Sequence, residues 1–335
     1  MAGFVTAFMN PFNYVGGVSF TPENDIPDLA DKVIMVTGGD GLAVYAMLIY
    51  RSGNAGLGKE SILQLIKHNP KKVFLGARSE SKAQEAIKSL KSSVSNEVDI
   101  TWVPLDLISG KSIKSAAEQV NAQTDRLDIL ILNAGVMALP PGETELGHEI
   151  QLGTNHTGHF HLTKLLLPTL LKTAEQPGTD VRVVSLSSVG HNLAPAFETI
   201  LDQEKLKNVN TNFRYGASKA ANILFAAELA RRYPSLTSVS VHPGVIMTDL
   251  YGSMSERSSV VALGHKVMGC VGTSVSQGAC NQLWAAAGAK KEELRNGAYY
   301  VPVGNRKAQN KFASDEDMGR RLWEWTETEL QKANL

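Results

Sequence analysis

Short apolar runs rich in β-branched residues alternate along this chain with stretches of helical periodicity. The apolar runs predict buried strands at 31–37, 73–76, 99–104, 127–132, 181–187 and 237–242. Amphipathic patterns predict helices at 61–66, 84–90, 113–120, 220–230 and 316–332. Strands that alternate with helices form a parallel sheet covered on both faces. The pattern therefore predicts an α/β fold, built on a doubly wound parallel sheet.

Length and composition favour one domain rather than two. The chain has 335 residues, and no linker rich in Pro, Gly or Ser divides it. We therefore expect an N-terminal extension at 1–30 and a single domain at 31–335. The 33 basic and 33 acidic residues cancel, so charge predicts binding to neither nucleic acid nor an anionic membrane.

The N-terminal segment is apolar but lacks the features of a targeting sequence. No Lys or Arg precedes Lys32, and Asn10-Pro11 interrupts the apolar run, so we expect neither a signal peptide nor a transmembrane helix. Cys270 and Cys280 match no metal or redox spacing, which favours reduced intracellular thiols. We expect a cytoplasmic protein, with weak peripheral membrane attachment as the alternative.

Tyr215 and Lys219 form a Tyr-x-x-x-Lys pair at the start of the apolar helical stretch 220–230. Residues four apart lie on one face of a helix, where an ammonium group lowers the pKa of a phenol. Such a phenol exchanges a proton with a substrate oxygen near neutral pH. An exposed helical pair without chemistry is the alternative, and the surrounding sequence decides between the two.

Glycine and polar residues follow the predicted strands, at the edge where an open parallel sheet binds its ligands. Thr37-Gly38 ends the first strand, and Asn54-Ala-Gly56-Leu-Gly58 opens the next helix. Joined, these pieces read Thr-Gly-x-x-x-Gly-x-Gly between a strand and a helix, which is the form of a dinucleotide-binding loop. Further residues of this kind end the later strands, in Asn133-Ala-Gly135, Ser187-Ser188 and His242-Pro243-Gly244.

In the order and spacing of these motifs the chain resembles the short-chain dehydrogenase/reductase family, in the branch of retinol dehydrogenases and their fungal relatives. The resemblance runs from about residue 31 to about residue 300. It implies an oxidoreductase that transfers hydride between a nicotinamide and a carbonyl or carbinol carbon, without a metal.

The resemblance implies a catalytic role for four residues. Tyr215 is the general acid/base, and Lys219 lowers its pKa and holds the nicotinamide ribose. Ser188 orients the substrate, whereas Ser187 faces the supporting shell, because neighbours in a strand point to opposite faces. Asn155 links a water molecule to the lysine, and its alternative is a capping or turn asparagine.

The end of the second strand favours NADP(H) over NAD(H). A fold that selects NAD offers a carboxylate there, but this chain has Arg78, which suits a 2′-phosphate, with Lys82 close in sequence. By resemblance, Asp106 contacts the adenine and Thr248 the nicotinamide carboxamide. The predicted cofactor-binding residues are Thr37, Gly38, Gly56, Leu57, Gly58, Lys59, Arg78, Lys82, Asp106, Asn133, Tyr215, Lys219, Val245 and Thr248.

The glycine loop departs from the family pattern because residues 40–53 interrupt it, with an unbroken apolar run from Leu42 to Tyr50. This composition is unusual for a solvated loop. Three interpretations are open: the segment loops out, it packs over the cofactor site, or it is a translated intron, which we favour. A loop that no longer bound cofactor would leave a non-catalytic binding or regulatory protein, which is the alternative to an enzyme.

Residues 246–273 occupy the place where this fold usually grows its substrate lid. Methionine and branched aliphatic residues are frequent there, which favours a small hydrophobic ketone, aldehyde or alcohol as substrate. An amphipathic helix packed on the core is the alternative. Fungal relatives of this branch imply a role in secondary metabolism.

Two further motifs are expected to be structural. The histidines of the run His156-Thr-Gly-His-Phe-His161 have no Cys, Asp or Glu at ligand spacing, so we expect no metal site. Trp323 and Trp325 are expected to dock the final helix on the body or on a second subunit. The resemblance implies a dimer face on the helices that carry Asn155 and Tyr215, so a homodimer stays open.

Overall fold

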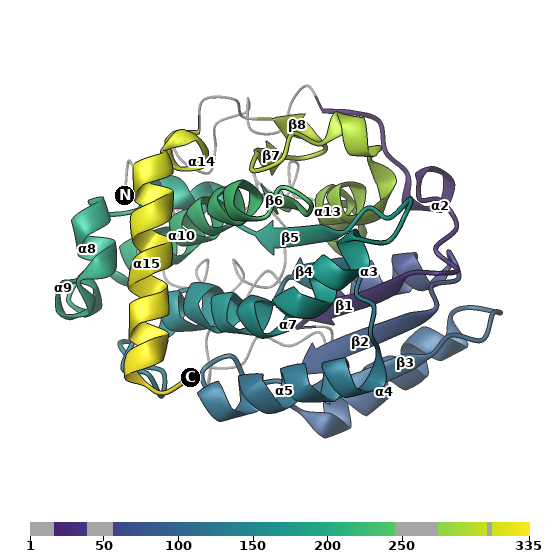
Figure 1. Cartoon of the computed structure of the whole chain (residues 1–335), viewed down its shortest axis with the longest axis horizontal. Coiled ribbons are helices and arrows are strands. Elements are labelled where there is room, and N and C mark those ends of the chain that lie inside the picture. Colours follow the sequence, from purple (N-terminus) through teal and green to yellow (C-terminus); the bar gives the residue numbers. More distant parts are fainter. Residues whose placement is uncertain (1–16, 39–55, 245–273, 307–309) are drawn as a thin grey trace, which may run out of the picture.

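The computed structural model describes residues 17–38, 56–244, 274–306 and 310–335. Its strands are β1 (Val33–Thr37), β2 (Lys72–Ala77), β3 (Ile100–Pro104), β4 (Ile129–Leu132), β5 (Arg182–Leu186), β6 (Thr237–Val241), β7 (Tyr299–Val301) and β8 (Asn305–Arg306). They form one sheet in the order β3-β2-β1-β4-β5-β6-β7-β8 (Figure 1). Neighbouring strands are parallel except β7 and β8. This arrangement confirms the predicted doubly wound parallel sheet.

Helices connect the strands and cover the sheet. The α-helices are α2 (Pro22–Asp25), α3 (Leu57–Ile66), α4 (Glu80–Ser92), α5 (Gly110–Gln123), α6 (Ile150–Leu152), α7 (Gly158–Ala174), α8 (Phe197–Leu201), α9 (Gln203–Lys207), α10 (Thr211–Arg232), α13 (Val275–Leu283), α14 (Lys311–Ser314) and α15 (Glu316–Lys332). Shorter helical turns are η2 (Gly153–Thr157), η3 (Val189–Leu193), η4 (Trp284–Gly288) and η5 (Lys291–Glu293).

Several helices begin earlier than their apolar periodicity suggests, because their first turns are polar and capped. Ser79 caps α4 and Ser109 caps α5, each by accepting a hydrogen bond from the backbone N–H three residues further on. A capped polar turn carries no apolar signal, so the sequence pattern locates only the buried middle of each helix.

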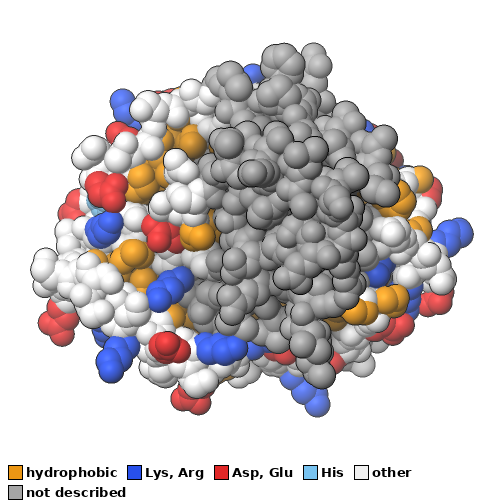
Figure 2. Space-filling model, turned by 180° about the vertical axis from the view of Figure 1, so that it is seen from behind, with side chains coloured by type: hydrophobic (Ala, Val, Ile, Leu, Met, Phe, Trp, Pro, Cys, Tyr) orange, Lys and Arg blue, Asp and Glu red, His pale blue; other side chains and the backbone are white. Residues whose placement is uncertain are grey.

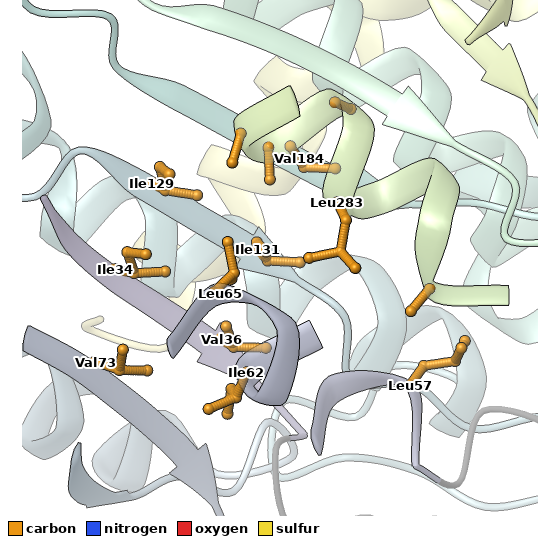
Figure 3. Packing of buried hydrophobic residues seen from close by; sticks show 14 of the residues in the cluster. Ile34, Val36, Leu57, Ile62, Leu65, Val73, Ile129, Ile131, Val184 and Leu283 are labelled. Carbon is orange, nitrogen blue, oxygen red and sulfur yellow. The ribbon is translucent and has the colours of Figure 1, made fainter. Parts of the chain in front are cut away.

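Alternate residues of each strand point to opposite faces of the sheet, and helices cover both faces. Ile34 and Val36 of β1 belong to a buried cluster with residues of α3, α4 and α13, part of which is seen in Figure 3. Val33 and Met35 belong to a second cluster, with residues of α5, α7, α10 and α15 on the other face. Burial on both faces makes the strands nearly continuous apolar runs, which is why the sequence pattern located them.

The final helix, α15, is held on the body by a tryptophan. The ring of Trp323 is buried against Phe160 of α7 and Phe225 of α10, with centroid separations of 4.7 and 6.0 Å. The Arg232 guanidinium lies 4.9 Å from the centroid of the same ring. Figure 1 shows α15, in yellow, beside α10. Trp323 therefore docks this helix on its own chain.

Three predicted segments fall on residues outside the described ranges: most of the N-terminal extension, the insertion at 40–53 and the lid at 246–273. No helix among the described residues is long and apolar enough to cross a membrane. On the described part of the face in Figure 2, acidic and basic side chains are interspersed, in keeping with a net charge of zero.

Candidate active site

The carboxyl ends of β1, β2, β3 and β4 border a cavity of about 460 Å³. The strand order reverses between β1 and β4, which is where open α/β sheets bind their ligands. A volume of this size lies within the range of small-molecule sites. Lining residues from the strand ends are Gly38, Gly76, Arg78, Asp106, Ala134 and Gly135, and residues 139–143 form one wall.

The helix α10 places Tyr215 and Lys219 beside the carboxyl end of β5. The Lys219 side chain is buried, and its Nζ donates a hydrogen bond to the carbonyl of Leu186 at 3.0 Å. The same Nζ lies 5.6 Å from the centroid of the Tyr215 ring. At this separation a positive charge stabilises a phenolate, so the geometry allows the interaction that the four-residue spacing predicts.

Burial dominates the electrostatics of Lys219. Loss of hydration lowers the pKa of its ammonium to about 7 from the ordinary 10.5, and no described carboxylate offsets this effect. The charged and neutral forms of Lys219 are therefore close in free energy near neutral pH. A negative charge brought close to Nζ would shift the balance toward the ammonium form.

Ser188 follows β5 and lies beside Tyr215, with Gly190 between them. A Cβ atom on Gly190 would lie 2.8 Å from Tyr215 Cε1 and 3.4 Å from Ser188 Oγ, so the absence of a side chain lets the ring approach the serine. Ser187 points the other way, and its hydroxyl donates to the carbonyl of Lys219 at 2.7 Å. The strand period thus places Ser188, rather than Ser187, next to the tyrosine.

Asn155 lies in η2, a π-helical turn in which the Gly158 N–H donates to the carbonyl of Gly153. Its Oδ1 accepts a hydrogen bond from the Val136 N–H at 2.7 Å. Its Nδ2 donates to the Val136 carbonyl and to Ser218 Oγ, both at 2.9 Å. These partners belong to the loop after β4 and to α10, so the Asn155 amide joins that loop to α10 and does not cap a helix.

Gly135 lies closely packed beside Asn155 and Lys219. A Cβ atom there would lie 3.1 Å from Asn155 Oδ1 and 3.5 Å from Lys219 Nζ. Gly135 also lines the cavity, so the cavity extends toward the lysine. A side chain at this position would crowd the Asn155 amide and lie between the cavity and Lys219 Nζ, so glycine keeps the approach of a polar ligand to this donor free.

The predicted loop residues Thr37, Gly38 and Asn133 bring the ends of β1 and β4 together. Gly38 has a φ of 72°, a left-handed conformation that favours glycine. Asn133 Nδ2 donates to the Thr37 carbonyl at 2.9 Å, so this amide shapes the loop instead of lining the cavity. The start of α3 closes on Gly38, since a Cβ on Gly58 would clash with the Gly38 carbonyl.

The predicted cationic residues differ in where they point. Arg78 is exposed and lines the cavity together with Asp106, and no hydrogen bond or ion pair with a described residue engages its guanidinium. Lys82 is half-buried in the first turn of α4 and is not among the lining residues. The Lys59 ammonium donates to Ser89 Oγ of α4 at 3.0 Å, so its side chain lies along α4 and its backbone N–H belongs to the loop.

The remaining predicted cofactor residues lie at the start of α3 or outside the described ranges. Gly56 precedes α3 with a φ of 105°, and Leu57 is buried at the first position of that helix. Val245 and Thr248 lie outside the described residues. Among the residues that are described, no three His, Cys, Asp or Glu side chains come together as metal ligands.

A buried ion pair that no sequence motif indicates supports the cavity wall. Arg214 Nη1 donates to Glu149 Oε1 at 2.9 Å, and Nη2 donates to the Leu139 carbonyl at 3.0 Å. Thr211 Oγ1 donates to the same carbonyl at 2.8 Å. Arg214 directly precedes Tyr215, so these bonds join the wall at 139–143 to the start of α10. Its partner is 65 residues away in sequence, and no local pattern indicates that contact.

Known sequences resemble this chain over most of its length. A family model described as short chain dehydrogenase matches residues 46–198. A short-chain dehydrogenase/reductase of Armillaria gallica is 38% identical over 313 residues, which cover 92% of this chain and 93% of the relative. Retinol dehydrogenase 12 of Mus musculus is 33% identical over 312 residues, which cover 92% of this chain and 88% of the relative.

Solved structures share the fold. An uncharacterized protein from Mycobacterium Paratuberculosis has a TM-score of 0.66 at 26% identity, covering 94% of this chain and 98% of its own. The NADPH-bound carbonyl reductase from chicken fatty liver has a TM-score of 0.55 at 22% identity, covering 81% of this chain and 96% of its own. At that identity the second likeness concerns the fold alone.

Proposed function

The chain belongs to the short-chain dehydrogenase/reductase family and is an oxidoreductase, and we propose that it uses NADP(H) to reduce the carbonyl of a small hydrophobic ketone or aldehyde, or to oxidise the matching alcohol. The observation that carries the proposal is the convergence of Tyr215, Lys219 and Ser188, with Gly135 lining the cavity next to Lys219. The nicotinamide, when bound, supplies or accepts the hydride.

Tyr215 exchanges the proton with the substrate oxygen in this proposal. The charge on Lys219, 5.6 Å from the ring centroid, stabilises the phenolate and so lowers the pKa of the phenol. Ser188 Oγ, on the other side of Gly190 from the ring, holds the carbonyl oxygen by a hydrogen bond. Asn155 keeps the loop after β4 in place relative to α10 and to Lys219.

The charge state of Lys219 depends on what is bound next to it. Because burial alone lowers its pKa to about 7, the ammonium needs a compensating partner to persist at higher pH. The phosphate charges of a dinucleotide favour the ammonium form, so binding of the cofactor and uptake of a proton at Lys219 are linked.

Arg78 supports the choice of NADP(H). The guanidinium is exposed at the rim of the cavity, and no described carboxylate pairs with it. It is therefore available for charge-assisted hydrogen bonds to a 2′-phosphate. A carboxylate at this place, which would select the free ribose hydroxyls of NAD, is absent from the sequence 74–79.

An apolar wall supports a hydrophobic substrate. Leu139, Pro140, Pro141 and Ile150 line one side of the cavity, and such surfaces favour apolar ligands. The name of the mouse relative, retinol dehydrogenase 12, points to the same class of alcohol. We further propose a cytoplasmic enzyme, with a homodimer as its assembly and secondary metabolism as its setting.

The test is NADPH oxidation with a panel of hydrophobic ketones and aldehydes, compared between the full chain and Tyr215→Phe. We expect the variant to bind NADPH about as tightly as the parent and to lose turnover by a factor of about 10² or more. Undiminished turnover in Tyr215→Phe would refute the proton-transfer role.

The glycine-loop interruption is tested in the same assay. We expect a variant lacking residues 40–53 to retain turnover, because Thr37-Gly38-Gly39 then joins Asn54-Ala-Gly56-Leu-Gly58 as an uninterrupted dinucleotide loop. No turnover with either the full chain or this variant would refute the reductase assignment.

A further inference from the structure

His159 is a buried histidine beside the candidate active site, to which the proposed chemistry gives no role. It lies in the first turn of α7, directly after the π-helical turn that holds Asn155, and it is only 2% exposed. Its ring bridges two parts of the site. Nε2 lies 2.9 Å from Thr37 Oγ1, at the end of β1, and Nδ1 lies 3.0 Å from the backbone carbonyl of Asn155.

The partners of the ring determine its tautomer. A carbonyl oxygen only accepts hydrogen bonds, so Nδ1 of His159 carries the proton and donates to Asn155. In a neutral ring Nε2 then accepts, and Thr37 Oγ1 donates to it. The Thr37 hydroxyl in turn accepts from the Ala134 N–H at 3.0 Å. Each donor in this chain of hydrogen bonds meets an acceptor.

The surroundings of the ring favour the neutral form. Burial, together with the nearby Lys219 charge, lowers the pKa of His159 to about 4, against the opposing effect of the bond to the Asn155 carbonyl. The tautomer with Nδ1–H is therefore the form expected at neutral pH.

These contacts close a ring of hydrogen bonds around the loop after β4. The ring runs from Ala134 to Thr37, from Thr37 through His159 to Asn155, and from the Asn155 amide back to Val136. Gly135 lies between Ala134 and Val136, at the position that packs against Lys219 Nζ. Without His159, the connection between Thr37 and Asn155 would be lost.

We propose that His159 is a positioning residue, which couples the end of β1 to Asn155 and so holds Gly135 in place at the junction of the cofactor cavity and the Tyr215–Lys219 pair. The inference rests on the proposed reductase function for its effect on turnover. Its geometric content, a bridging neutral ring with Nδ1–H, can be tested without turnover.

Two isosteric variants separate the two contacts. The amide of His159→Asn occupies the place of Nδ1 and can still donate to the Asn155 carbonyl, but it does not reach Thr37. The amide of His159→Gln occupies the place of Nε2 and can still accept from Thr37, but it leaves the Asn155 carbonyl without its donor.

We expect the two variants to divide their effects between binding and turnover. In His159→Asn, the Kd for NADPH rises about fivefold or more and kcat at saturating NADPH stays within about threefold, since the contact to the end of β1 is lost. In His159→Gln, kcat falls about tenfold or more and the Kd for NADPH stays within about threefold, since the contact to Asn155 is lost.

His156 provides the matched control. It is also a buried histidine, three residues earlier, but its Nε2 contacts Thr326 Oγ1 of α15 at 3.1 Å. We expect His156→Asn and His156→Gln to lower thermal stability. Both variants should leave the Kd for NADPH and kcat at the values of the parent. A purely structural role of His159 would give this same pattern, and the positioning proposal would then be wrong.

A nitrogen-15 NMR spectrum of the imidazole rings supplies the readout that needs no turnover. We expect the His159 signals, identified by their loss in His159→Asn, to show a protonated Nδ1 and an unprotonated, hydrogen-bonded Nε2 at neutral pH. A protonated Nε2 would overturn the proposal whatever the variants did to turnover. If the wild type bound NADPH but reduced no carbonyl, the proposed function would be wrong. The tautomer of His159 and the difference in Kd for NADPH between His159→Asn and His159→Gln would still test its positioning role.

Discussion

Removal of the Arg78 side chain is expected to weaken NADPH binding while NADH binding stays unchanged. The guanidinium is exposed, and no described residue forms an ion pair with it, so Arg78→Ala removes no stabilising contact of the described fold. We expect the free energy of unfolding to change by less than about 0.5 kcal/mol. The variant therefore reports on the ligand rather than on the fold.

The expected loss follows from the chemistry of the 2′-phosphate. A hydrogen bond to a charged group contributes about 1.5–3 kcal/mol, which corresponds to a rise of about 10- to 150-fold in the Kd for NADPH. NADH lacks the phosphate, so its Kd should stay within about twofold of the parent value. Arg78→Asp should move the preference further toward NADH, because a carboxylate repels the phosphate and accepts from a ribose hydroxyl.

Fluorescence titration with each nucleotide measures both constants in the parent and in the variants. The matched control is Lys88→Ala, which removes an exposed positive charge from α4 at a position that does not line the cavity. We expect this control to leave both Kd values as they are. An Arg78→Ala protein with the NADPH preference of the parent would refute the account of cofactor selection.

Three further predictions follow from buried groups. Gly190→Ala should reduce turnover without weakening NADPH binding, because the new Cβ would lie 2.8 Å from Tyr215 Cε1; normal kcat would contradict the position of the ring. Glu149→Gln should lower the free energy of unfolding by about 3–5 kcal/mol, since it leaves a buried arginine unpaired. Urea unfolding measures this loss against Asp125→Asn in an exposed pair, and equal effects would refute it. The free energy of unfolding in urea should also fall from pH 7 to pH 5, by up to about 1.4 kcal/mol per pH unit for each histidine that takes up a proton on unfolding. Burial lowers the folded-state pKa of these histidines from 6.5 to about 3 or 4. Their contribution to stability is therefore present above pH 6.5 and is lost as the pH falls toward the folded-state values. A free energy of unfolding that did not change between pH 7 and pH 5 would contradict this prediction. The histidines concerned are His156, His159, His191 and His242.

The parts of the fold that could be predicted from the sequence are those determined by local composition. The strands β1, β2 and β4 are buried on both faces and appear as apolar runs. The four-residue spacing in α10 brings Tyr215 and Lys219 together, and the two-residue period of a strand separates Ser187 from Ser188. Each of these features depends on residues close together in sequence.

The features that were missed depend on residues far apart in sequence. β7 is short and pairs with β6 across a long connection, so its three residues carry no periodic signal. The bridge from His159 to Thr37 spans 122 residues, and the contact between Arg214 and Glu149 spans 65. No local pattern indicates which buried polar side chain meets which partner, so the histidine run could be read as structural but its partners could not be identified.

The most direct test of the account is the transfer of deuterium from NADPH deuterated at nicotinamide C4 to a hydrophobic ketone, followed by mass spectrometry of the alcohol. We expect one deuterium on the carbinol carbon with the full chain. With a Tyr215→Phe protein that still binds NADPH, we expect the yield of labelled alcohol to fall by a factor of about 10² or more. Labelled alcohol formed equally by both proteins, or none formed by the full chain while it binds NADPH, would contradict the assignment of the site as a reductase centre.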